Sequence, residues 1–153
     1  MPAQLGARSL ERLSTCDPDL QLLVRWTEAH MPFDITVLCG HRPPEEQFEL
    51  FKQGRALVGG KWVVMDQAAV VTNVDGFETV GRHNEDPSSA VDMAPHPVSW
   101  ASRDHWRFHV MAGVMLAGSV ELGIPITWGA DWDGDGDIHD HSLVDLPHFQ
   151  LKR

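Results

Sequence analysis

The chain has 153 residues, of which 42% are hydrophobic and 22% are charged, and this composition is typical of one globular domain spanning 1–153. Its net charge of −10 argues against a nucleic-acid-binding protein and against docking on an anionic membrane. The first residues lack the basic start and apolar run of a signal peptide, and no segment approaches the roughly 20 apolar residues that span a bilayer. We therefore expect a protein made in the cytosol that does not insert into membranes.

The first half of the chain predicts helices separated by short strands. Apolar residues at helical spacing predict a helix over 8–30, and the alternating, β-branched segment 33–39 predicts a strand. A second helix is predicted over 45–53, where a glycine follows its last residue. Beyond it the pattern weakens, and short strands are predicted at 63–65 and 69–73.

The second half of the chain contains its clearest helix, over 106–122, and Gly123 ends it. Strands are predicted at 90–94, 124–128 and 148–151. Because helices and strands mix without strict alternation, we expect an α+β fold with a small antiparallel sheet. Apolar residues of the long helix are expected on its buried side: Phe108, Met111, Ala112, Met115, Leu116 and Val120.

The two cysteines, Cys16 and Cys39, are far apart and lack the paired spacing of a metal knuckle or a redox site. We expect both to be reduced and to pack as small hydrophobic side chains.

Two histidines and an aspartate form a candidate metal site. His83 lies in a polar loop, Asp92 on the strand that follows, and His148 near the C-terminus. A catalytic zinc takes three nitrogen or oxygen ligands and keeps one position open, and this set meets that requirement. Spacing alone leaves the alternative that each histidine is structural or solvent-exposed. Five further histidines are treated as non-catalytic, although a loop could bring the last two near the metal: His96, His105, His109, His139 and His141.

The segment 131–145 is unusually acidic, and crowded carboxylates repel one another unless a cation lies among them. It begins with the D-x-D-x-D-G pattern of a calcium loop, but Ser142 stands at the twelfth position, where such a loop needs a bidentate glutamate. A true EF-hand is therefore not expected. A looser calcium site remains a candidate, and a solvated acidic loop is the alternative; the candidate ligands are Asp131, Asp133, Asp135 and Asp137.

Three groups of residues together carry a family resemblance. They are GHRPPEEQ at 40–47, the segment 81–92 that begins GRH and ends AVD, and WGADW at 128–132 followed by DLPHFQL at 145–151. Their order and spacing resemble the motifs of the D-alanyl-D-alanine carboxypeptidase and phage L-alanyl-D-glutamate peptidase family, over about 8–151. The resemblance implies the fold of the carboxypeptidase and hedgehog-type group, a small antiparallel metal-binding sheet packed against helices.

The resemblance also implies the roles of individual residues. His83, Asp92 and His148 would bind zinc, and Asp145 would be the general base that activates the attacking water. Asp92 lies nine positions after His83, about two more than is common in the family, so we expect the insert at 85–87 to bulge. The family's serine two residues before the first histidine is replaced here by glycine.

Two further residues complete the expected active site. Arg42 would hold a substrate carboxylate and polarise the scissile carbonyl, a role that suits its planar and permanently charged guanidinium. Gln47 would help to orient that end of the substrate.

The function implied is that of a monomeric zinc endopeptidase, a phage endolysin, that cleaves the L-alanyl-D-glutamate bond of bacterial peptidoglycan. Without a signal peptide, it would leave the cytoplasm of the infected host after holin-type release. A D-alanyl-D-alanine carboxypeptidase or dipeptidase of the same family is one alternative, although those enzymes more often carry glutamate where Asp145 stands. A zinc- or calcium-binding recognition module without activity is another, and it would not need to keep Asp145.

Overall fold

A four-stranded antiparallel sheet organises the protein, whose computed structural model describes residues 4–153. The strands lie in the order β1 (Ile35–Cys39), β4 (Ala90–Pro95), β6 (His148–Leu151) and β5 (Ile126–Trp128). Their positions agree with the predicted strands to within two residues. The small antiparallel sheet, together with the helices, confirms the expected α+β fold.

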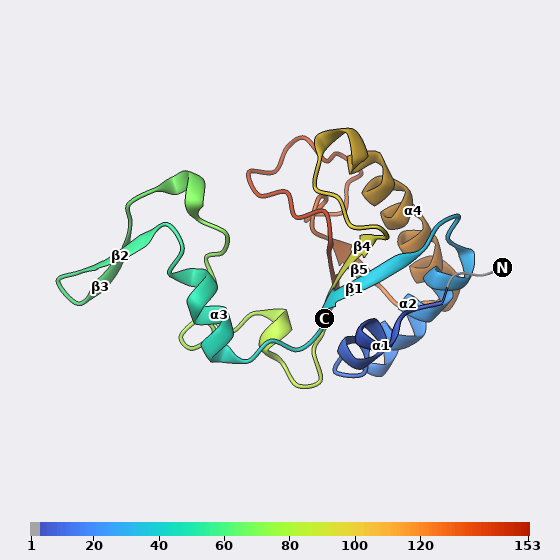
Figure 1. Cartoon of the computed structure of the whole chain (residues 1–153), viewed down its shortest axis with the longest axis horizontal. Coiled ribbons are helices and arrows are strands. Elements are labelled where there is room, and N and C mark those ends of the chain that lie inside the picture. Colours follow the sequence, from blue (N-terminus) through green and yellow to red (C-terminus); the bar gives the residue numbers. More distant parts are fainter. Residues whose placement is uncertain (1–3) are drawn as a thin grey trace.

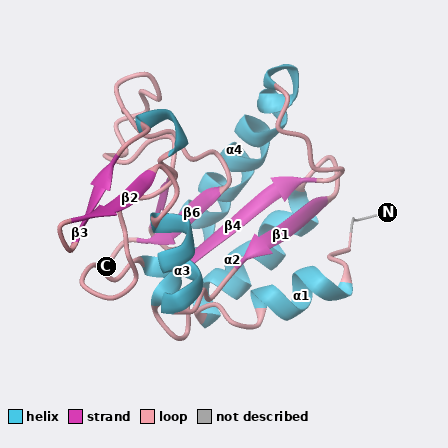
Figure 2. Cartoon of the chain, turned by 60° about the vertical axis from the view of Figure 1, so that its left-hand side comes forward, coloured by secondary structure: helices cyan, strands magenta, loops and turns pink. Residues whose placement is uncertain are grey.

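Three helices cover one face of this sheet (Figure 2). They are α1 (Ala7–Leu13), α2 (Pro18–His30) and α4 (His105–Leu122), which follows the single-turn helix η3 (Ser102–Asp104). Helix α2 packs against α4, and both α1 and α4 contact the sheet. The buried core lies in this interface between helices and sheet.

The prediction of one continuous helix over 8–30 was wrong, because a turn separates α1 from α2. Pro18 has no backbone N–H to donate to a preceding turn, so it suits the first position of a new helix. Asp17 caps that helix, since its carboxylate accepts a hydrogen bond from the backbone N–H of Asp19 at 2.9 Å. The turn between the helices is therefore encoded by Asp17 and Pro18.

The long helix α4 buries a stripe of apolar side chains, but two residues predicted to belong to it are exposed. Leu116 is 37% exposed and Val120 is 84% exposed. The stripe instead continues from Met115 to Gly118, which lies directly against Trp26 of α2. A glycine gives no apolar signal, so the sequence pattern placed the end of the stripe on the wrong side of the helix.

Replacing Gly118 by alanine is expected to lower the free energy of unfolding by about 1–3 kcal/mol, because the core is already packed. A Cβ atom at this position would lie 2.5 Å from Cε3 of Trp26 and 2.9 Å from a methyl carbon of Leu23. Gly113 of the same helix is the matched control, since a Cβ there would meet nothing within 4 Å. Gly113→Ala should raise the free energy of unfolding by up to about 1 kcal/mol. Urea denaturation measures the free energy of unfolding of both variants. Equal changes in the two variants would contradict the packing of Gly118 against Trp26.

A second structural unit projects from the main sheet as an arm (Figure 1). It contains α3 (Pro44–Phe51) and a separate two-stranded sheet formed by β2 (Arg55–Val58) and β3 (Lys61–Val64). A single-turn helix, η1 (Gln67–Ala69), follows. The predicted strand at 69–73 was wrong, because this segment runs without strand pairing.

The first strand of the hairpin was not predicted, although its turn is clear in the structure. Gly59 and Gly60 have φ angles of +57° and +78° and connect antiparallel β2 and β3. Two successive residues with positive φ give the turn whose twist matches that of the strands, and glycine adopts it without strain. Elsewhere in the fold, no helix within residues 4–153 is both long and apolar enough to cross a bilayer.

Candidate active site

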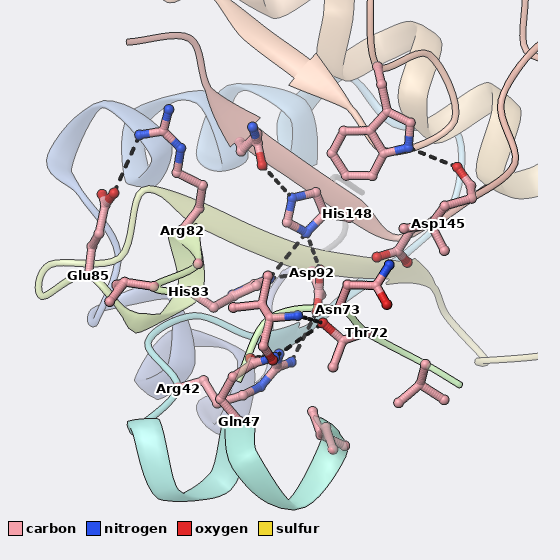
Figure 3. A pocket seen from close by; sticks show the side chains of 18 of the residues that line it. Arg42, Gln47, Thr72, Asn73, Arg82, His83, Glu85, Asp92, Asp145 and His148 are labelled. Carbon is pink, nitrogen blue, oxygen red and sulfur yellow. Dashed lines mark hydrogen bonds and ion pairs between the residues drawn. The ribbon is translucent and has the colours of Figure 1, made fainter. Parts of the chain in front are cut away.

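The three predicted metal ligands meet at one end of the main sheet (Figure 3). Asp92 on β4 lies directly opposite His148 on β6 in the antiparallel register, and side chains of such a pair share one face of a sheet. His83 comes from a single helical turn, η2 (Arg82–Asn84), and completes the group. Two residues 56 positions apart are thus brought together by strand pairing.

The ligand atoms form a nearly equilateral triangle. Nε2 of His83 lies 3.1 Å from Oδ1 of Asp92 and 3.2 Å from Nδ1 of His148, and the last two atoms are 3.2 Å apart. Ligand atoms about 2.0–2.1 Å from a tetrahedral zinc lie roughly 3.3 Å from one another. The triangle therefore has the size that such an ion requires, and its two nitrogens and one oxygen are donors that zinc accepts.

The electrostatics of the group also favour a cation. Burial would raise the pKa of Asp92, but hydrogen bonds from His148 and His83 lower it well below the ordinary range. Burial likewise opposes the charging of His83, but its hydrogen bonds to Asp92 and Cys39 raise its pKa to about 10. In the metal-free protein, His83 therefore carries a proton that a metal ion has to displace.

Each histidine is held by a second hydrogen bond on its other ring nitrogen. The carbonyl oxygen of Gly40 lies 2.7 Å from Nδ1 of His83. Oε1 of Gln150 lies 3.0 Å from Nε2 of His148. These acceptors fix the tautomer in which the remaining nitrogen, Nε2 of His83 or Nδ1 of His148, has its lone pair free for a metal.

Asp145 lies beside the ligands, on the loop that leads into β6. One of its carboxylate oxygens is within 4.8 Å of ligand atoms of Asp92 and His148. Burial raises the pKa of Asp145, and the negative charge of Asp92 raises it further. A carboxyl group with a raised pKa next to a metal site is suited to accept and deliver a proton near neutral pH.

The loop that carries Asp145 is held by hydrogen bonds from the WGADW segment (128–132). The indole N–H groups of Trp128 and Trp132 donate to the carbonyl oxygens of Leu146 and Leu143, both at 2.8 Å. The carbonyl of Gly129 accepts the backbone N–H of Asp145 at 2.8 Å. A Cβ at Gly129 would lie 2.3 Å from the backbone oxygen of Asp145, so only glycine permits this approach.

Arg42 reaches the site from the loop after β1. One guanidinium nitrogen lies 3.6 Å from Oδ2 of Asp92, and the other donates to Oε1 of Gln47 at 2.9 Å. Gln47 is buried, and its amide nitrogen donates to the carbonyl oxygen of Val74 at 2.9 Å. The geometry therefore makes Gln47 a support for Arg42, with its polar atoms bonded inside the protein.

Both cysteines are free, as predicted, but Cys39 does more than fill apolar space. Its sulfur lies within 4.8 Å of ligand atoms of His83 and Asp92, and it accepts a hydrogen bond from Arg42 at 3.5 Å. Cys16 is buried in the core as expected. The thiol of Cys39 thus lies next to two of the predicted metal ligands and also contacts Arg42.

A cleft of about 710 Å³ opens over these groups. Its polar floor includes the predicted metal ligands, Arg42 and Asp145. Its rim toward the arm is mixed, with the apolar Leu50, Val71 and Val80 beside the polar Gln53, Thr72 and Asn73. A cleft of this size is in the range that binds small ligands and peptide segments.

A family model for the phage L-alanyl-D-glutamate peptidases matches residues 1–152. The chain belongs to this peptidase family. It is 25% identical to the L-alanyl-D-glutamate peptidase of Escherichia phage T5 over 158 residues, which cover 99% of each protein. It also resembles the crystal structure of the Serratia marcescens L-Ala D-Glu endopeptidase ChiX, with a TM-score of 0.65 and 25% identity over 97% of this chain and 90% of that one. The family resemblance predicted from the sequence is thus confirmed.

The Asp-rich loop of this peptidase brings some, but not all, of the predicted calcium ligands together. Carboxylate oxygens of Asp133, Asp135 and Asp140 lie within 4.8 Å of one another. Both carboxylate oxygens of Asp131 accept backbone N–H groups of the loop. Asp137 instead contacts the ring of His139 at 3.2 Å.

The two histidines of this loop do not join the three predicted metal ligands. Nε2 of His141 lies 3.2 Å from Asp140 and 3.4 Å from Asp133, within the acidic loop. His139 is exposed beside Asp137. The default assignment of both residues as non-catalytic therefore agrees with their positions.

Gln150 is, with Cys39, a residue of the site that the sequence reasoning missed. It follows His148 by two positions in a strand, so both side chains point to the same face of the sheet. That spacing, which places a second polar side chain on the face of His148, was the available signal.

Replacing Gln150 by leucine is expected to weaken zinc binding by about 10–100-fold, because His148 loses the acceptor that fixes its tautomer. Gln150→Glu is the matched control, since it keeps an acceptor oxygen at the same distance along the side chain. Competition with a chromophoric chelator measures both affinities. Wild-type affinity in the leucine variant would show that Gln150 does not orient the ligand.

Proposed function

We propose that this peptidase hydrolyses the L-alanyl-D-glutamate bond of peptidoglycan stem peptides with a zinc ion held by His83, Asp92 and His148. The observation that carries the proposal is the triangle of ligand atoms, 3.1–3.2 Å on each side, next to the half-buried carboxyl group of Asp145. Membership of the phage L-alanyl-D-glutamate peptidase family supports the choice of bond.

The residues around the ligands divide the reaction between them. Zinc would supply Lewis-acid chemistry and acidify a water molecule. Asp145 accepts the proton of the water that attacks the alanyl carbonyl carbon, and then delivers it to the D-glutamate nitrogen as the C–N bond breaks. Arg42 binds a carboxylate of the substrate and stabilises negative charge on the carbonyl oxygen. Gln47 acts through Arg42 by holding its guanidinium in place.

Digestion of purified Gram-negative peptidoglycan, followed by mass spectrometry of the released peptides, tests this function. The zinc-loaded protein is expected to release peptides that begin with D-glutamate, and a chelator should abolish their release. Loss of terminal D-alanine alone would assign the protein to the carboxypeptidase branch of the family. Folded, zinc-loaded protein that gives no product would leave the alternative of a recognition module.

We also propose that the Asp-rich loop binds calcium through Asp131, Asp133 and Asp135, with Asp140 in place of Asp137. The D-x-D-x-D-G pattern and the close carboxylates support this proposal. Calcium titration by calorimetry is expected to show binding that the double variant Asp133→Asn/Asp135→Asn abolishes. Equal heats of calcium titration for the wild type and the double variant would mean that the loop is solvated and binds no calcium.

For the protein as a whole, we infer that residues 1–153 act as one monomeric catalytic domain. We also infer that it reaches the wall from the cytoplasm of an infected bacterium after holin-type release. The family model spans residues 1–152, which supports a single catalytic domain, and membership of a phage peptidase family supports the route of release. Light scattering coupled to size-exclusion chromatography tests the monomer, and lysis of cells that express the protein with and without a holin tests the release.

A further inference from the structure

The β2–β3 hairpin (residues 55–64) exposes aliphatic side chains on both of its faces. In an antiparallel pair, residues opposite each other share a face, so Leu57 and Val64 lie on one side and Val58 and Val63 on the other. Leu57 is 60% exposed and Val58 is 54% exposed, and each of the other two is 41% exposed. A hairpin that faces water usually has one polar side, and this one has none.

The hairpin is attached to the arm at two places, through Trp62 near its turn and at its open end. The ring of Phe48 on α3 packs edge-on against Trp62 at 5.7 Å and against Phe77 at 5.9 Å between centroids. The carbonyl oxygen of Gly54 accepts the backbone N–H of Met65 at 2.8 Å, which closes the hairpin at its open end. The exposed aliphatic residues are therefore carried on a fixed projection (Figure 1).

The hairpin has the opposite charge to the rest of the chain. Residues 52–65 include Lys52, Arg55 and Lys61 but no aspartate or glutamate, whereas the chain as a whole has a net charge of −10. Lys52 pairs with Glu49 at 2.7 Å. The guanidinium of Arg55 donates to uncharged oxygens of the arm, and Lys61 has no ion pair with any residue of 4–153.

We propose that the β2–β3 hairpin dips into the interfacial layer of an anionic lipid bilayer. A protein partner or a glycan strand would cover one face of the ribbon, whereas a lipid layer reaches the exposed aliphatic side chains of both faces. Lys61, which lies opposite Val58 beside the turn, would extend its long side chain to anionic headgroups, and the acidic body of the protein would stay in water. Four residues per strand, at about 3.3 Å each, reach about 13 Å, which is long enough to enter the interfacial layer and too short to cross the roughly 30 Å hydrocarbon core.

This proposal refines the expectation from total charge, which argued against an anionic membrane. A net charge describes the whole chain at long range, but salt screens such interactions beyond about 8–10 Å. Contact is therefore decided by the charge and the apolar surface of the part that touches the bilayer. The hairpin is the cationic and apolar part.

Flotation with large vesicles tests the proposal. Wild-type protein is expected to float with vesicles of phosphatidylglycerol and phosphatidylcholine, and only weakly with vesicles of pure phosphatidylcholine. Val58→Glu should lower the partition coefficient about tenfold, since it replaces an apolar side chain of the inserted tip by a negative charge. The matched control is Val120→Glu, because this valine is 84% exposed on α4, outside the arm. It should bind like the wild type.

Charge reversal separates the electrostatic contribution from the apolar one. Lys61→Glu changes the charge by two units and should weaken binding to anionic vesicles by roughly thirtyfold. It should have little effect on the weak binding to neutral vesicles. Circular dichroism of each variant verifies the fold, and hydrolysis of soluble stem peptides should be unchanged because these side chains lie outside the cleft.

Three outcomes would overturn the proposal. The first is equal flotation of Val58→Glu and Val120→Glu. The second is wild-type protein that fails to float but binds peptidoglycan sacculi through the hairpin, which would assign this surface to the wall. The third is a wild-type dimer in solution that Val58→Glu converts into a monomer, which would assign the surface to a second copy of the chain.

Discussion

Replacing Asp145 by asparagine is expected to lower kcat for peptidoglycan hydrolysis by roughly a thousandfold, with bound zinc unchanged at about one ion per chain. Asparagine keeps the shape of the side chain but cannot accept a proton from water. No atom of Asp145 belongs to the ligand triangle, so the variant should still bind the metal. Kinetic release of new amino groups measures the rate, and elemental analysis of the purified variant measures the zinc.

The pH profile of the wild type gives an independent test of the same role. Asp145 can act as a base only when it is deprotonated, and burial together with the charge of Asp92 raises its pKa above the ordinary value of about 3.9. Activity should therefore fall as the pH decreases through this raised pKa. The residual activity of Asp145→Asn should lack that acidic limb.

Asp86→Asn is the control for removing a negative charge near the site. Asp86 is exposed, lies three residues after the predicted metal ligand His83 and does not line the cleft. The activity of the Asp86→Asn variant should equal that of the wild type. An Asp145→Asn variant that binds zinc and keeps more than a tenth of the wild-type rate would show that another group acts as the base.

Much of the site was predictable because its residues stand in short motifs that the fold brings together by strand pairing. The spacing from His83 to Asp92 was the least secure element, since the chain has extra residues at 85–87. The structure shows why that insert leaves the triangle intact. His83 is fixed by Gly40 on one side of the insert, and the backbone N–H of Ser88 donates to the carbonyl oxygen of Thr15 on the other.

The supporting residues were less predictable because their roles depend on contacts across the fold. Gln150 and Cys39 carry no motif of their own, and only the three-dimensional structure places one behind His148 and the other beside His83. The same holds for Gly129, whose missing side chain lets the loop of Asp145 approach. Sequence patterns report periodicity and spacing, whereas these roles come from non-local packing.

The arm was the least predictable part of the fold for a different physical reason. Strand patterns are recognised when one face is apolar and the other polar, and the hairpin of β2 and β3 is apolar on both. Its first strand therefore gave no alternating signal. The feature that obscured the hairpin in the sequence is also the one that carries the membrane proposal.

Replacing His83 by alanine is expected to weaken zinc binding by at least about a hundredfold, because two donor atoms remain where catalytic zinc uses three. His109→Ala is the matched control, since this histidine is exposed on α4, and it should bind zinc like the wild type. Chelator competition measures the affinities. Zinc should also stabilise the wild type, by about 2.7 kcal/mol at a free concentration of 100 times Kd, but not the His83→Ala variant. Full zinc binding by His83→Ala would exclude His83 as a ligand.

The pH dependence of zinc binding distinguishes this ligand set from a surface site. Zinc has to displace the proton that Asp92 and Cys39 hold on His83, whose pKa is raised to about 10 in the metal-free protein. Affinity should therefore rise as the pH increases from 6 toward about 10, with about one proton released for each zinc bound near pH 8. Calorimetry in buffers of different ionisation enthalpy counts that proton. The His83→Ala variant should release fewer protons, and an affinity that is independent of pH would mean that zinc binds elsewhere.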